Sequence, residues 1–359
     1  MIPYSPSYLI KINGTELRHG VSVNVMSVSI TDTCDRADSF NLRISDRHEK
    51  QGRFAAGASL KWMDSALFDE GSEIEIELGY VNHMTFKFKG EITAVSASFP
   101  ASGSPELQVR GFSHYHRLQR KRRTKAFESS KASDIAEEIA KDMGFKAEVD
   151  KTDAEHPHTL SEDETYESIL KSKARPIGFE VVVKEKVLYF QKPGYLKNPS
   201  PSLTLEWGKD LDNFSPSIGT YSMPTEVVVR SSQTSNGGGK SALVGTAKAG
   251  EESVKMGDKT GSEIAKEIFG DNPVKITEST VATQKEARDI ALAQLEAKSI
   301  EFITARGSCI GNPDLKARQV VKIKGAGKRY SGNYYVTSVT HTIDARGFLT
   351  SFELKRNGR

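Results

Sequence analysis

Two histidines separated by one residue are the first candidates for chemistry in this sequence. His114 and His116 lie on or just after a predicted strand, where alternate side chains project from the same face. Two imidazoles on one face can bind zinc, but the flanking residues supply no cysteine or carboxylate to complete a four-ligand site. We therefore interpret both histidines as partly exposed strand residues and predict no metal site.

A denser cluster of titratable residues lies in a loop that contains a proline. His156 and His158 flank Pro157, and Asp153 and Glu155 precede them. Such residues could act as general acid and base in a hydrolase. Carboxylates in a solvated loop keep nearly ordinary pKa values, however, and the sequence contains neither a phosphate-binding loop nor a nucleophile elbow. We predict no catalytic residue, no cofactor and no enzymatic activity.

Two rows of like charge are the next candidates. Glu73, Glu75 and Glu77 alternate with apolar residues, so they share one face of a predicted strand. Lys322 and Lys324 have the same spacing near the C-terminus. Three glutamates on one strand face are typical of an exposed or interface-facing row. We hypothesise that the rows of opposite sign meet across the boundaries between β-units, or alternatively that they line a channel.

The stretch from 117 to 125 is the best candidate for nucleic-acid binding. Its basic side chains, which include Arg120, Arg122 and Arg123, would bind phosphates in a strongly salt-dependent manner. No aromatic residue alternates with them to provide a stacking platform. We favour contact between these residues and an acidic protein surface at a domain junction, and we expect no specific nucleic-acid binding.

Composition limits the class of protein. The chain has 359 residues, enough for two or three domains, and a formal net charge of +3, which argues against a chain-wide nucleic-acid or membrane surface. No signal peptide and no apolar run of bilayer length is found, so we expect cytoplasmic synthesis and no membrane insertion. Cys34 and Cys309 are too few for a disulfide framework.

The elements that must position these residues are mostly strands, and one arrangement of strands occurs twice. Residues 72–80 alternate apolar and charged side chains, and residues 86–95 form a second alternating run after a polar loop. The same order occurs at 319–325 and 330–339, and each copy contains an aromatic-x-glycine motif (Phe88-Lys89-Gly90 and Tyr330-Ser331-Gly332). We infer one small β-barrel fold used twice.

The predicted fold class is mainly β with an α+β insert, in which two related small antiparallel β-barrels flank a helix-hairpin domain. Ser133 is expected to begin a helix in the insert, Ser161 and Glu164 form a capping-box pattern before a second helix, and residues 179–190 alternate as a hairpin. Gly, Ser and Lys dominate the residues from 231 onward, which predicts a mobile loop. The predicted division is a first tube-like barrel at 1–125, the insert at 126–195, and a second tube-like barrel at 196–359 with the mobile loop at about 231–260 and a helix at about 283–299.

With these parts placed, nearly the whole chain resembles the baseplate hub proteins of contractile phage tails and related injection systems, the phage late-control protein D family. The order and spacing of several segments carry the resemblance, and no single motif is diagnostic. One departure concerns residues 193–201, where the family usually has a helix and where two flanking prolines predict an extended segment here. The segments that carry the resemblance are 117–125, 163–170, 188–190, 223–230, 311–313 and 330–336.

The resemblance implies a structural role. Family members are homotrimers in which two tube-like barrels per subunit form a pseudo-sixfold ring that joins a hexameric tail tube to a trimeric spike. We therefore expect a homotrimeric hub that is incorporated into a phage tail or a tail-like particle, after synthesis in a bacterial cytoplasm. The expected partners are a trimeric spike on a separate polypeptide, the tail tube and other baseplate proteins. Two alternatives stay open: a tail-associated peptidoglycan-degrading enzyme that uses His156 or Glu155, and a nucleic-acid-binding module that uses residues 117–125.

Overall fold

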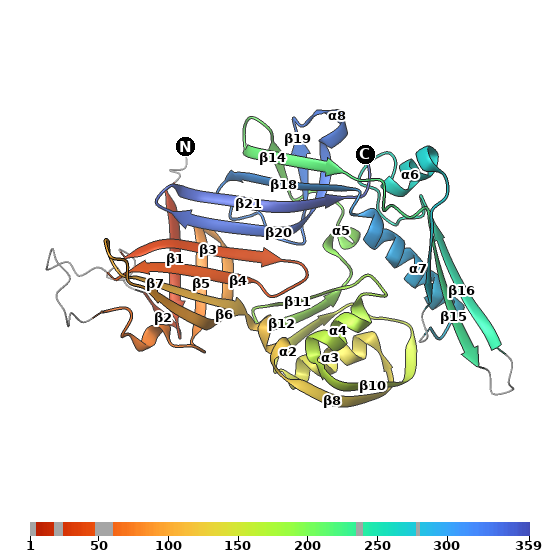
Figure 1. Cartoon of the computed structure of the whole chain (residues 1–359), viewed down its shortest axis with the longest axis horizontal. Coiled ribbons are helices and arrows are strands. Elements are labelled where there is room, and N and C mark those ends of the chain that lie inside the picture. Colours follow the sequence, from red (N-terminus) through yellow and green to blue (C-terminus); the bar gives the residue numbers. More distant parts are fainter. Residues whose placement is uncertain (1–4, 18–23, 47–59, 235–239, 278–280) are drawn as a thin grey trace.

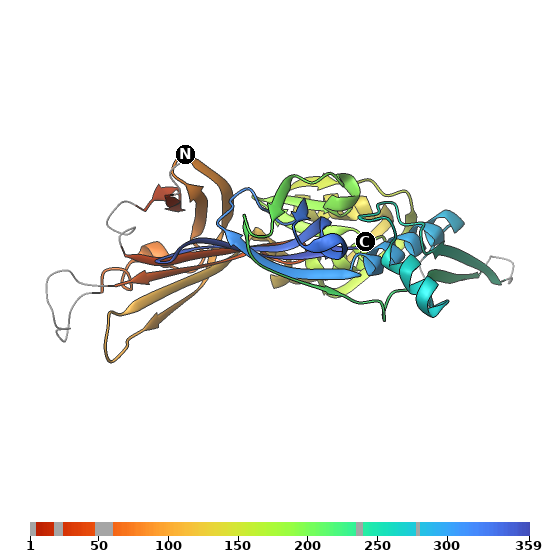
Figure 2. The same ribbon diagram turned by 90° about the horizontal axis from the view of Figure 1, so that it is seen from above.

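The computed structural model describes residues 5–17, 24–46, 60–234, 240–277 and 281–359. The molecule is elongated, with one group of strands at one end and the β15–β16 hairpin at the other (Figures 1 and 2). Most of the described residues with regular structure lie in strands, so the predicted mainly β fold with an α+β insert is confirmed. None of the helices in the described part of the chain is long and apolar enough to cross a membrane.

The N-terminal strands form a curved unit that we call the first β-block. Its core contains Ile74, Ile76 and Leu78, which are fully buried, while the glutamates between them are half-buried, as the alternation predicts. The neighbouring strands add further apolar residues to the same core. The elements are β1 (Pro6–Ile12), β2 (Thr15–Glu16), β3 (Val25–Thr33), β4 (Ser39–Ser45), η1 (Ala66–Phe68), β5 (Glu73–Tyr80), β6 (His83–Ser98) and β7 (Glu106–Ser113).

The C-terminal strands form a second β-block with the same strand order. The first β-block has the order β1-β5-β6-β7-β4-β3, and the second has β13-β19-β20-β21-β18-β14. One difference is that β1 is antiparallel to β5 whereas β13 is parallel to β19. The elements are β13 (Leu203–Glu206), β14 (Leu211–Ile218), β18 (Ile303–Ile310), β19 (Val320–Lys324), α8 (Gly327–Tyr330), β20 (Gly332–Asp344) and β21 (Gly347–Arg356).

The two β-blocks share one continuous sheet. Residues 338–344 of β20 pair with residues 27–33 of β3 in antiparallel register, beside the pairing of residues 332–335 with β19. The sheet therefore runs without a break from β14 at one end to β2 at the other, through strands from both halves of the chain (Figure 1).

The α+β insert lies between the two β-blocks in sequence and has its own core. The predicted boundary between residues 125 and 126 lies inside β8, and the segment predicted as extended after Pro193 is wrong in part, because Gly194–Lys197 forms one turn of helix, α5. Thr165, rather than Ser161, caps the second helix. The elements are η2 (His114–His116), α2 (Arg117–Arg120), β8 (Arg122–Lys131), α3 (Ala132–Asp142), β9 (Lys146–Val149), β10 (Glu155–Thr165), α4 (Tyr166–Ala174), β11 (Glu180–Lys184) and β12 (Val187–Gln191).

A three-stranded sheet and one helix, α7 (Gln284–Ser299), share a core and form a side domain within the C-terminal half, whereas helix α6 packs against the core of the second β-block. The mobile loop predicted at about 231–260 is wrong for residues 231–234 and 240–248, which lie in strands β15 and β16. Gly245 does not loosen this hairpin; a Cβ there would lie about 2.0 Å from the backbone of Ala287, so the glycine allows close packing of the helix. Helix α7 runs from Gln284 to Ser299, at the place where the sequence predicts a helix. The elements of this part of the chain are β15 (Glu226–Thr234), β16 (Lys240–Lys248), α6 (Gly261–Phe269), β17 (Pro273–Thr277) and α7 (Gln284–Ser299).

Candidate functional site

The seam between the two β-blocks is the first candidate, because it joins strands from opposite ends of the chain. On one face of the sheet, hydroxyl groups meet across it. Thr31 Oγ1 on β3 lies 3.0 Å from Thr340 Oγ1 on β20, and Ser29 Oγ lies 3.1 Å from Thr342 Oγ1. Such cross-strand hydroxyl pairs stabilise a sheet and specify its register.

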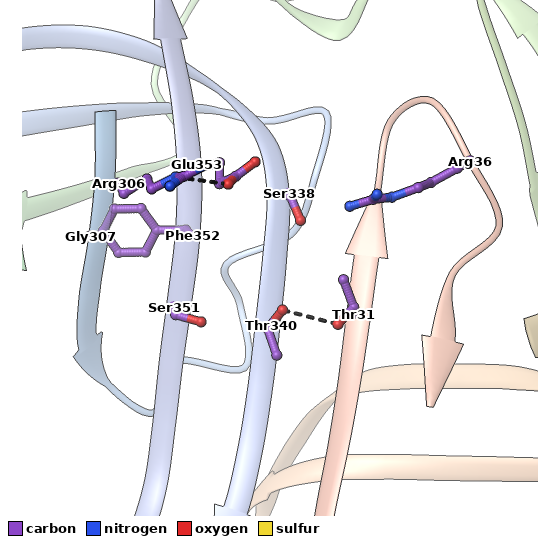
Figure 3. A pocket seen from close by; sticks show the side chains of 9 residues that line it. All are labelled: Thr31, Arg36, Arg306, Gly307, Ser338, Thr340, Ser351, Phe352 and Glu353. Atoms are coloured by element: carbon purple, nitrogen blue, oxygen red, sulfur yellow. Dashed lines mark hydrogen bonds and ion pairs between the residues drawn. The ribbon is translucent and has the colours of Figure 1, made fainter. Parts of the chain in front are cut away.

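A shallow polar hollow lies on this same face of the seam (Figure 3). Thr31 and Thr340 form part of its lining, and Arg36 extends from the loop after β3. Arg306 Nε donates to Glu353 Oε1 across 3.1 Å at its other side, and both of these side chains are largely exposed. The lining contains paired charges and hydroxyl groups, so we interpret it as a hydrated surface of the sheet.

A buried ion cluster ties the insert to the first β-block. Lys184 at the end of β11 binds Asp32 on β3, and its Nζ lies 2.5 Å from Asp38 Oδ2. Asp32 also accepts a hydrogen bond of 2.9 Å from the backbone N–H of Ala317 in the second β-block. Three parts of the chain therefore converge on two carboxylates that are each 6% exposed.

The pKa values in this cluster reflect burial and pairing together. Burial raises the pKa of Asp38 to about 6, against the opposing effect of the Lys184 ammonium. Burial alone would lower the pKa of Lys184, but the charges of Asp32 and Asp38 outweigh it and raise this pKa above its ordinary value. The lysine is thus held in its charged form between the two carboxylates.

A second cluster ties the insert to the second β-block. Glu180, at the start of β11, accepts hydrogen bonds from Arg318 Nε at 3.0 Å and from the hydroxyl of Tyr335 at 2.5 Å. All three side chains are mostly buried. Burial raises the pKa of Glu180, although Arg318 and the Tyr335 hydroxyl oppose the shift. Neither the cluster around Lys184 nor the one around Glu180 was predicted from the sequence.

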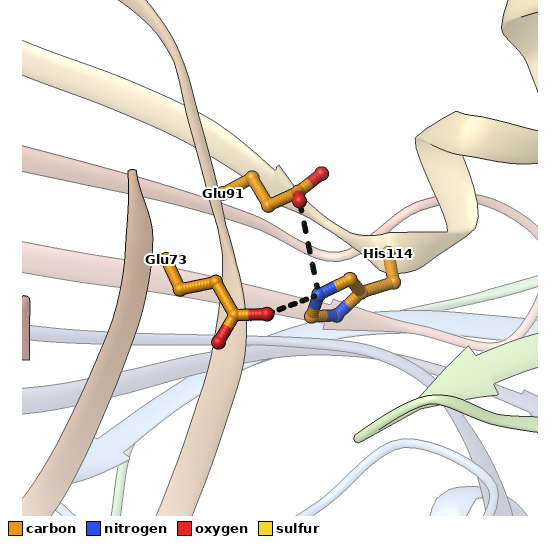
Figure 4. Close-up of side chains that lie close together, drawn as sticks. All are labelled: Glu73, Glu91 and His114. Atoms are coloured by element: carbon orange, nitrogen blue, oxygen red, sulfur yellow. Dashed lines mark ion pairs between the residues drawn. The ribbon is translucent and has the colours of Figure 1, made fainter. Parts of the chain in front are cut away.

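A third group of charges lies where the chain passes from β7 into the insert (Figure 4). Glu91 on β6 is buried, and Arg117 binds both of its carboxylate oxygens. His116 Nε2 lies 3.4 Å from Glu91, and His114 Nε2 lies 3.6 Å from Glu73. Burial opposes ionisation of Glu91, but the hydrogen bonds and charge of Arg117 outweigh it, so the pKa of Glu91 is lowered.

This third group bears on the question of a metal site, because it brings carboxylates close to the predicted histidine pair. The interpretation of His114 and His116 as partly exposed strand residues is wrong, since both are buried in the short helix η2. Ligand atoms of Glu73, Glu91 and His114 all lie within 4.8 Å of one another, and neither ring nitrogen of His114 has a hydrogen-bond partner among the described residues. The residue types suit zinc. Both carboxylates are already neutralised, however, Glu91 by Arg117 and Glu73 by Lys186 of the β11–β12 turn. A dication would have to displace these two cations, so we interpret the group as a joint between the first β-block and the insert.

The predicted charge rows lie on β5 and β19. Besides the pairing of Glu73 with Lys186, Glu75 lies 2.6 Å from Lys89 and Glu77 lies 3.4 Å from Lys87, so the glutamates have partners within the chain. Lys322 and Lys324 are exposed and have no ion-pair partner among the described residues.

Several side chains of the predicted basic run form hydrogen bonds within the insert itself. Arg122 Nη1 donates to the backbone carbonyl of Asp163 at 2.7 Å, and Arg123 Nη1 donates to the hydroxyl of Tyr166 at 2.9 Å. Arg120 is exposed at the end of α2. The run therefore offers less free positive charge than its sequence indicates.

The cluster around His156 forms its ion pairs with the first turn of helix α7 and not within its own loop. His156 Nε2 lies 3.2 Å from Glu286 in the first turn of α7, and Asp153 lies 2.5 Å from Lys285. Burial opposes the ionised form of Glu286, but the hydrogen bond from His156 and those from the backbone outweigh it and lower its pKa. The geometry joins the insert to the side domain, and Glu155 is exposed elsewhere on β10.

Comparison with known proteins shows which family model matches this chain and which solved structures share its architecture. The model of the family described as the Alg8 N-terminal domain matches residues 5–345, and no curated protein matches the chain. Among solved structures, the 43 kDa tail protein of prophage MuSo2 from Shewanella oneidensis is 13% identical, with 98% of each chain covered and a TM-score of 0.69. The tail protein from Neisseria meningitidis MC58 is 15% identical over 98% of this chain and 97% of its own, also with a TM-score of 0.69.

A third similar structure comes from a secretion system. It is an Escherichia coli component of the type VI secretion system, described as structurally similar to the T4 bacteriophage tail proteins gp27 and gp5. It is 12% identical, with 96% of this chain and 76% of that chain covered and a TM-score of 0.58. At such identities the likeness concerns the fold, and at that level the predicted resemblance to hub proteins of contractile tails is confirmed.

Proposed function

Because the chain belongs to the Alg8 N-terminal domain family and shares its fold with phage tail and type VI secretion proteins, we propose that it is a structural hub of a contractile tail or injection apparatus. In this role it acts as a homotrimer that joins a sixfold tail tube to a threefold spike. Its proposed location is therefore a phage tail or a tail-like particle, and its proposed partners are the tube, a trimeric spike and other baseplate proteins.

The observation that carries this proposal is the repeated strand order of the two β-blocks. Three chains arranged around an axis would present six similar β-blocks, which suits a sixfold tube on one side. The same three chains have only threefold symmetry in the insert and the side domain, which suits a trimeric spike. Because each chain contains the β-block twice, a trimer could fit a sixfold tube on one side and a threefold spike on the other.

The charged rows acquire a role in such a ring. The pairing of β5 with β6 and of β19 with β20 puts Glu75 and Glu77 at positions equivalent to Lys322 and Lys324. If the β-blocks alternate around the axis, acidic and basic rows alternate as well, either across the boundaries or along the lumen. Arg120, exposed beside the joint, is a further proposed contact for a partner protein.

The proposed role is mechanical and requires no catalytic group. The contacts that support it are the ion clusters of β11, which hold the insert against both β-blocks. Catalysis by His156 would require its release from Glu286. A zymogram on peptidoglycan, run with the wild type and with His156→Ala, is expected to show no lysis in either case.

Electron microscopy and light scattering of the purified full-length chain, alone and coexpressed with its tube and spike proteins, test the proposal. We expect annular particles with threefold symmetry and a mass three times the chain mass of 39.5 kDa. A chain that stays monomeric in the presence of both partners would refute the hub role.

A further inference from the structure

Among the unpaired sheet edges of the described strands, one stretch of β6 and the outer edge of β14 matter here. β6 pairs with β5 through residues 83–91, and the last backbone hydrogen bonds on that side are both made by Ile92, whose N–H donates to the carbonyl of Ser72 and whose carbonyl accepts from the N–H of Gly71. Beyond it, the edge formed by residues 94–98 has no partner strand in the described part of the chain. The second stretch belongs to β14, which has β18 as its single partner among the described strands and lies at one end of the sheet (Figure 1). Unpaired edges of this kind are templates for a further strand.

The internal repeat tells which residues of the two β-blocks are equivalent. β6 has an irregularity against β7 between Ile92 and Ala94, and β20 has one against β21 between Val336 and Ser338. Three consecutive buried residues precede each irregularity, so Ile92 corresponds to Val336. Following the cross-strand pairs from these residues gives one row in each block: Ile92, Gly111, Phe40 and Ile30 in the first, and Val336, Leu354, Ala305 and Pro216 in the second.

The equivalence shows that the two free edges are the counterparts of the two strands at the seam. β20 corresponds to β6, and β3 corresponds to β14. Within the chain, residues 338–344 of β20 are covered by β3. The corresponding stretch of β6 begins at Ala94, and no described strand covers it or pairs with the outer edge of β14, the strand that corresponds to β3.

We propose that β14 of a second copy of this chain pairs antiparallel with residues 94–98 of β6 and with Phe99 directly after it, and so repeats between chains the seam that β3 and β20 form within each chain. The inference rests on the proposed function and names the contact that would build the ring. The register follows from the internal seam: Val95 opposite Ile218 of the second copy, Ser96 opposite Ser217, Ala97 opposite Pro216, Ser98 opposite Ser215, and Phe99 opposite Phe214.

The side chains of the two edges fit this register. The hydroxyl pairs of the internal seam, Thr31 with Thr340 and Ser29 with Thr342, correspond to Ser217 with Ser96 and Ser215 with Ser98. All four of these serines are exposed in the single chain. Hydroxyl groups therefore face each other at both seams, on the same face of the sheet.

The apolar face fits as well. Phe99 is 65% exposed, whereas its counterpart on β20, Ile343, is 7% exposed because it packs against the core of the adjacent β-block. Phe214 and Ile218 are only half-buried against the core of the second β-block, where an incoming Phe99 would cover them. Pro216 lacks an N–H, so the intermolecular ladder has one hydrogen bond fewer than the internal one. A proline on an edge strand also disfavours indiscriminate pairing.

Disulfide trapping in the full-length chain tests the register. Directly opposed residues in antiparallel strands are close enough for a disulfide. We would mix a Ser96→Cys chain with a Ser217→Cys chain, and also prepare the double variant, oxidise gently, and analyse by non-reducing electrophoresis and mass measurement. Both serines are exposed, so each single variant should keep the melting temperature of the wild type.

The expected result is a mixed dimer from the two single variants and a covalent trimer from the double variant. A register control pairs Ser96→Cys with Ser215→Cys, which lies two residues away and should cross-link at least fivefold less. Noncovalent trimers that do not cross-link through Ser96 and Ser217 would overturn the edge pairing and leave the hub role standing. Cross-linked open chains without closed trimers would support the pairing and count against the trimeric hub. Chains that stay monomeric and uncross-linked with tube and spike present would overturn both.

Discussion

Glu180 and Lys184 lie four residues apart on β11 and are held by different halves of the sheet. Glu180 binds Arg318 of the second β-block, and Lys184 binds Asp32 and Asp38 of the first. Side chains four residues apart on a strand project from the same face. One short strand of the insert therefore forms ion pairs with both β-blocks, on the two sides of their seam, and restrains the orientation of one block relative to the other.

Replacing Lys184 by methionine should destabilise the fold strongly. The substitution leaves Asp32 and Asp38 together in a buried site without their counter-ion, and we expect a loss of about 3 kcal/mol in the free energy of unfolding. Urea denaturation at pH 7 measures it. Lys186→Met is the matched control, because its pair with Glu73 is largely exposed and should contribute less than about 1 kcal/mol. Equal effects of the two substitutions would contradict the role given to Lys184.

The joint at Glu91 should weaken in acid. The pKa of Glu91 is lowered in the fold from about 4.5, so its contribution to stability is fully present above that pH and is lost as the pH falls through the folded value. The difference in free energy of unfolding between the wild type and Glu91→Gln should therefore shrink below pH 4.5. Thermal unfolding between pH 3 and pH 7 measures this difference, and one that stays constant over the whole range would argue against the assignment.

Reversing the charges of Lys322 and Lys324 should impair assembly while leaving the single chain intact. Both side chains are exposed without ion-pair partners among the described residues, so the double change to glutamate should alter the free energy of unfolding by less than about 0.5 kcal/mol per site. In the proposed ring it would put acidic rows side by side. Light scattering should show fewer trimers, more clearly at low salt. The control Lys146→Glu with Lys275→Glu changes the net charge equally at exposed sites away from β19, and unchanged trimer content in the first variant would reject the charge hypothesis.

Placing a charge at Phe99 should separate assembly from folding. The side chain is 65% exposed, so Phe99→Asp should leave the melting temperature of the monomer nearly unchanged. At the proposed intermolecular seam the carboxylate would face apolar side chains, and the dissociation constant of the trimer should rise at least tenfold. Phe269→Asp is the control, because Phe269 on α6 is 71% exposed and lies away from both sheet edges. Sedimentation velocity of both variants over a concentration series distinguishes them.

Local patterns in the sequence were enough to predict the repeated unit. Alternation at Ile74, Ile76 and Leu78 indicates a half-buried strand, and the structure buries these three completely. The equivalence suggested by the aromatic-x-glycine motifs is displaced by two residues, however, because cross-strand pairing aligns Gly90 with Tyr334 rather than with Gly332. The motif occurs in both copies, but the backbone irregularity and the burial pattern define the true register.

The buried clusters could not be predicted from single segments, because each depends on contacts between distant parts of the chain. A signal was nevertheless present. Asp32 follows Val28 and Ile30 at alternate positions, on the face of β3 that is otherwise apolar. An acidic residue on a core-facing position requires a buried partner. Its partner Lys184 lies in the hairpin predicted at 179–190, and only the packing of the insert brings the two together.

The seam between β3 and β20 also sets an order for folding during synthesis. Thr31 and Thr340 are separated by 309 residues, so β3 leaves the ribosome long before its partner exists. Until then one edge of the N-terminal strands stays open to other nascent chains, and pairing over such a separation in sequence is intrinsically slow. A chain released before residue 338 would keep that edge permanently bare, so truncation from the C-terminus should produce aggregates even though every N-terminal strand is present.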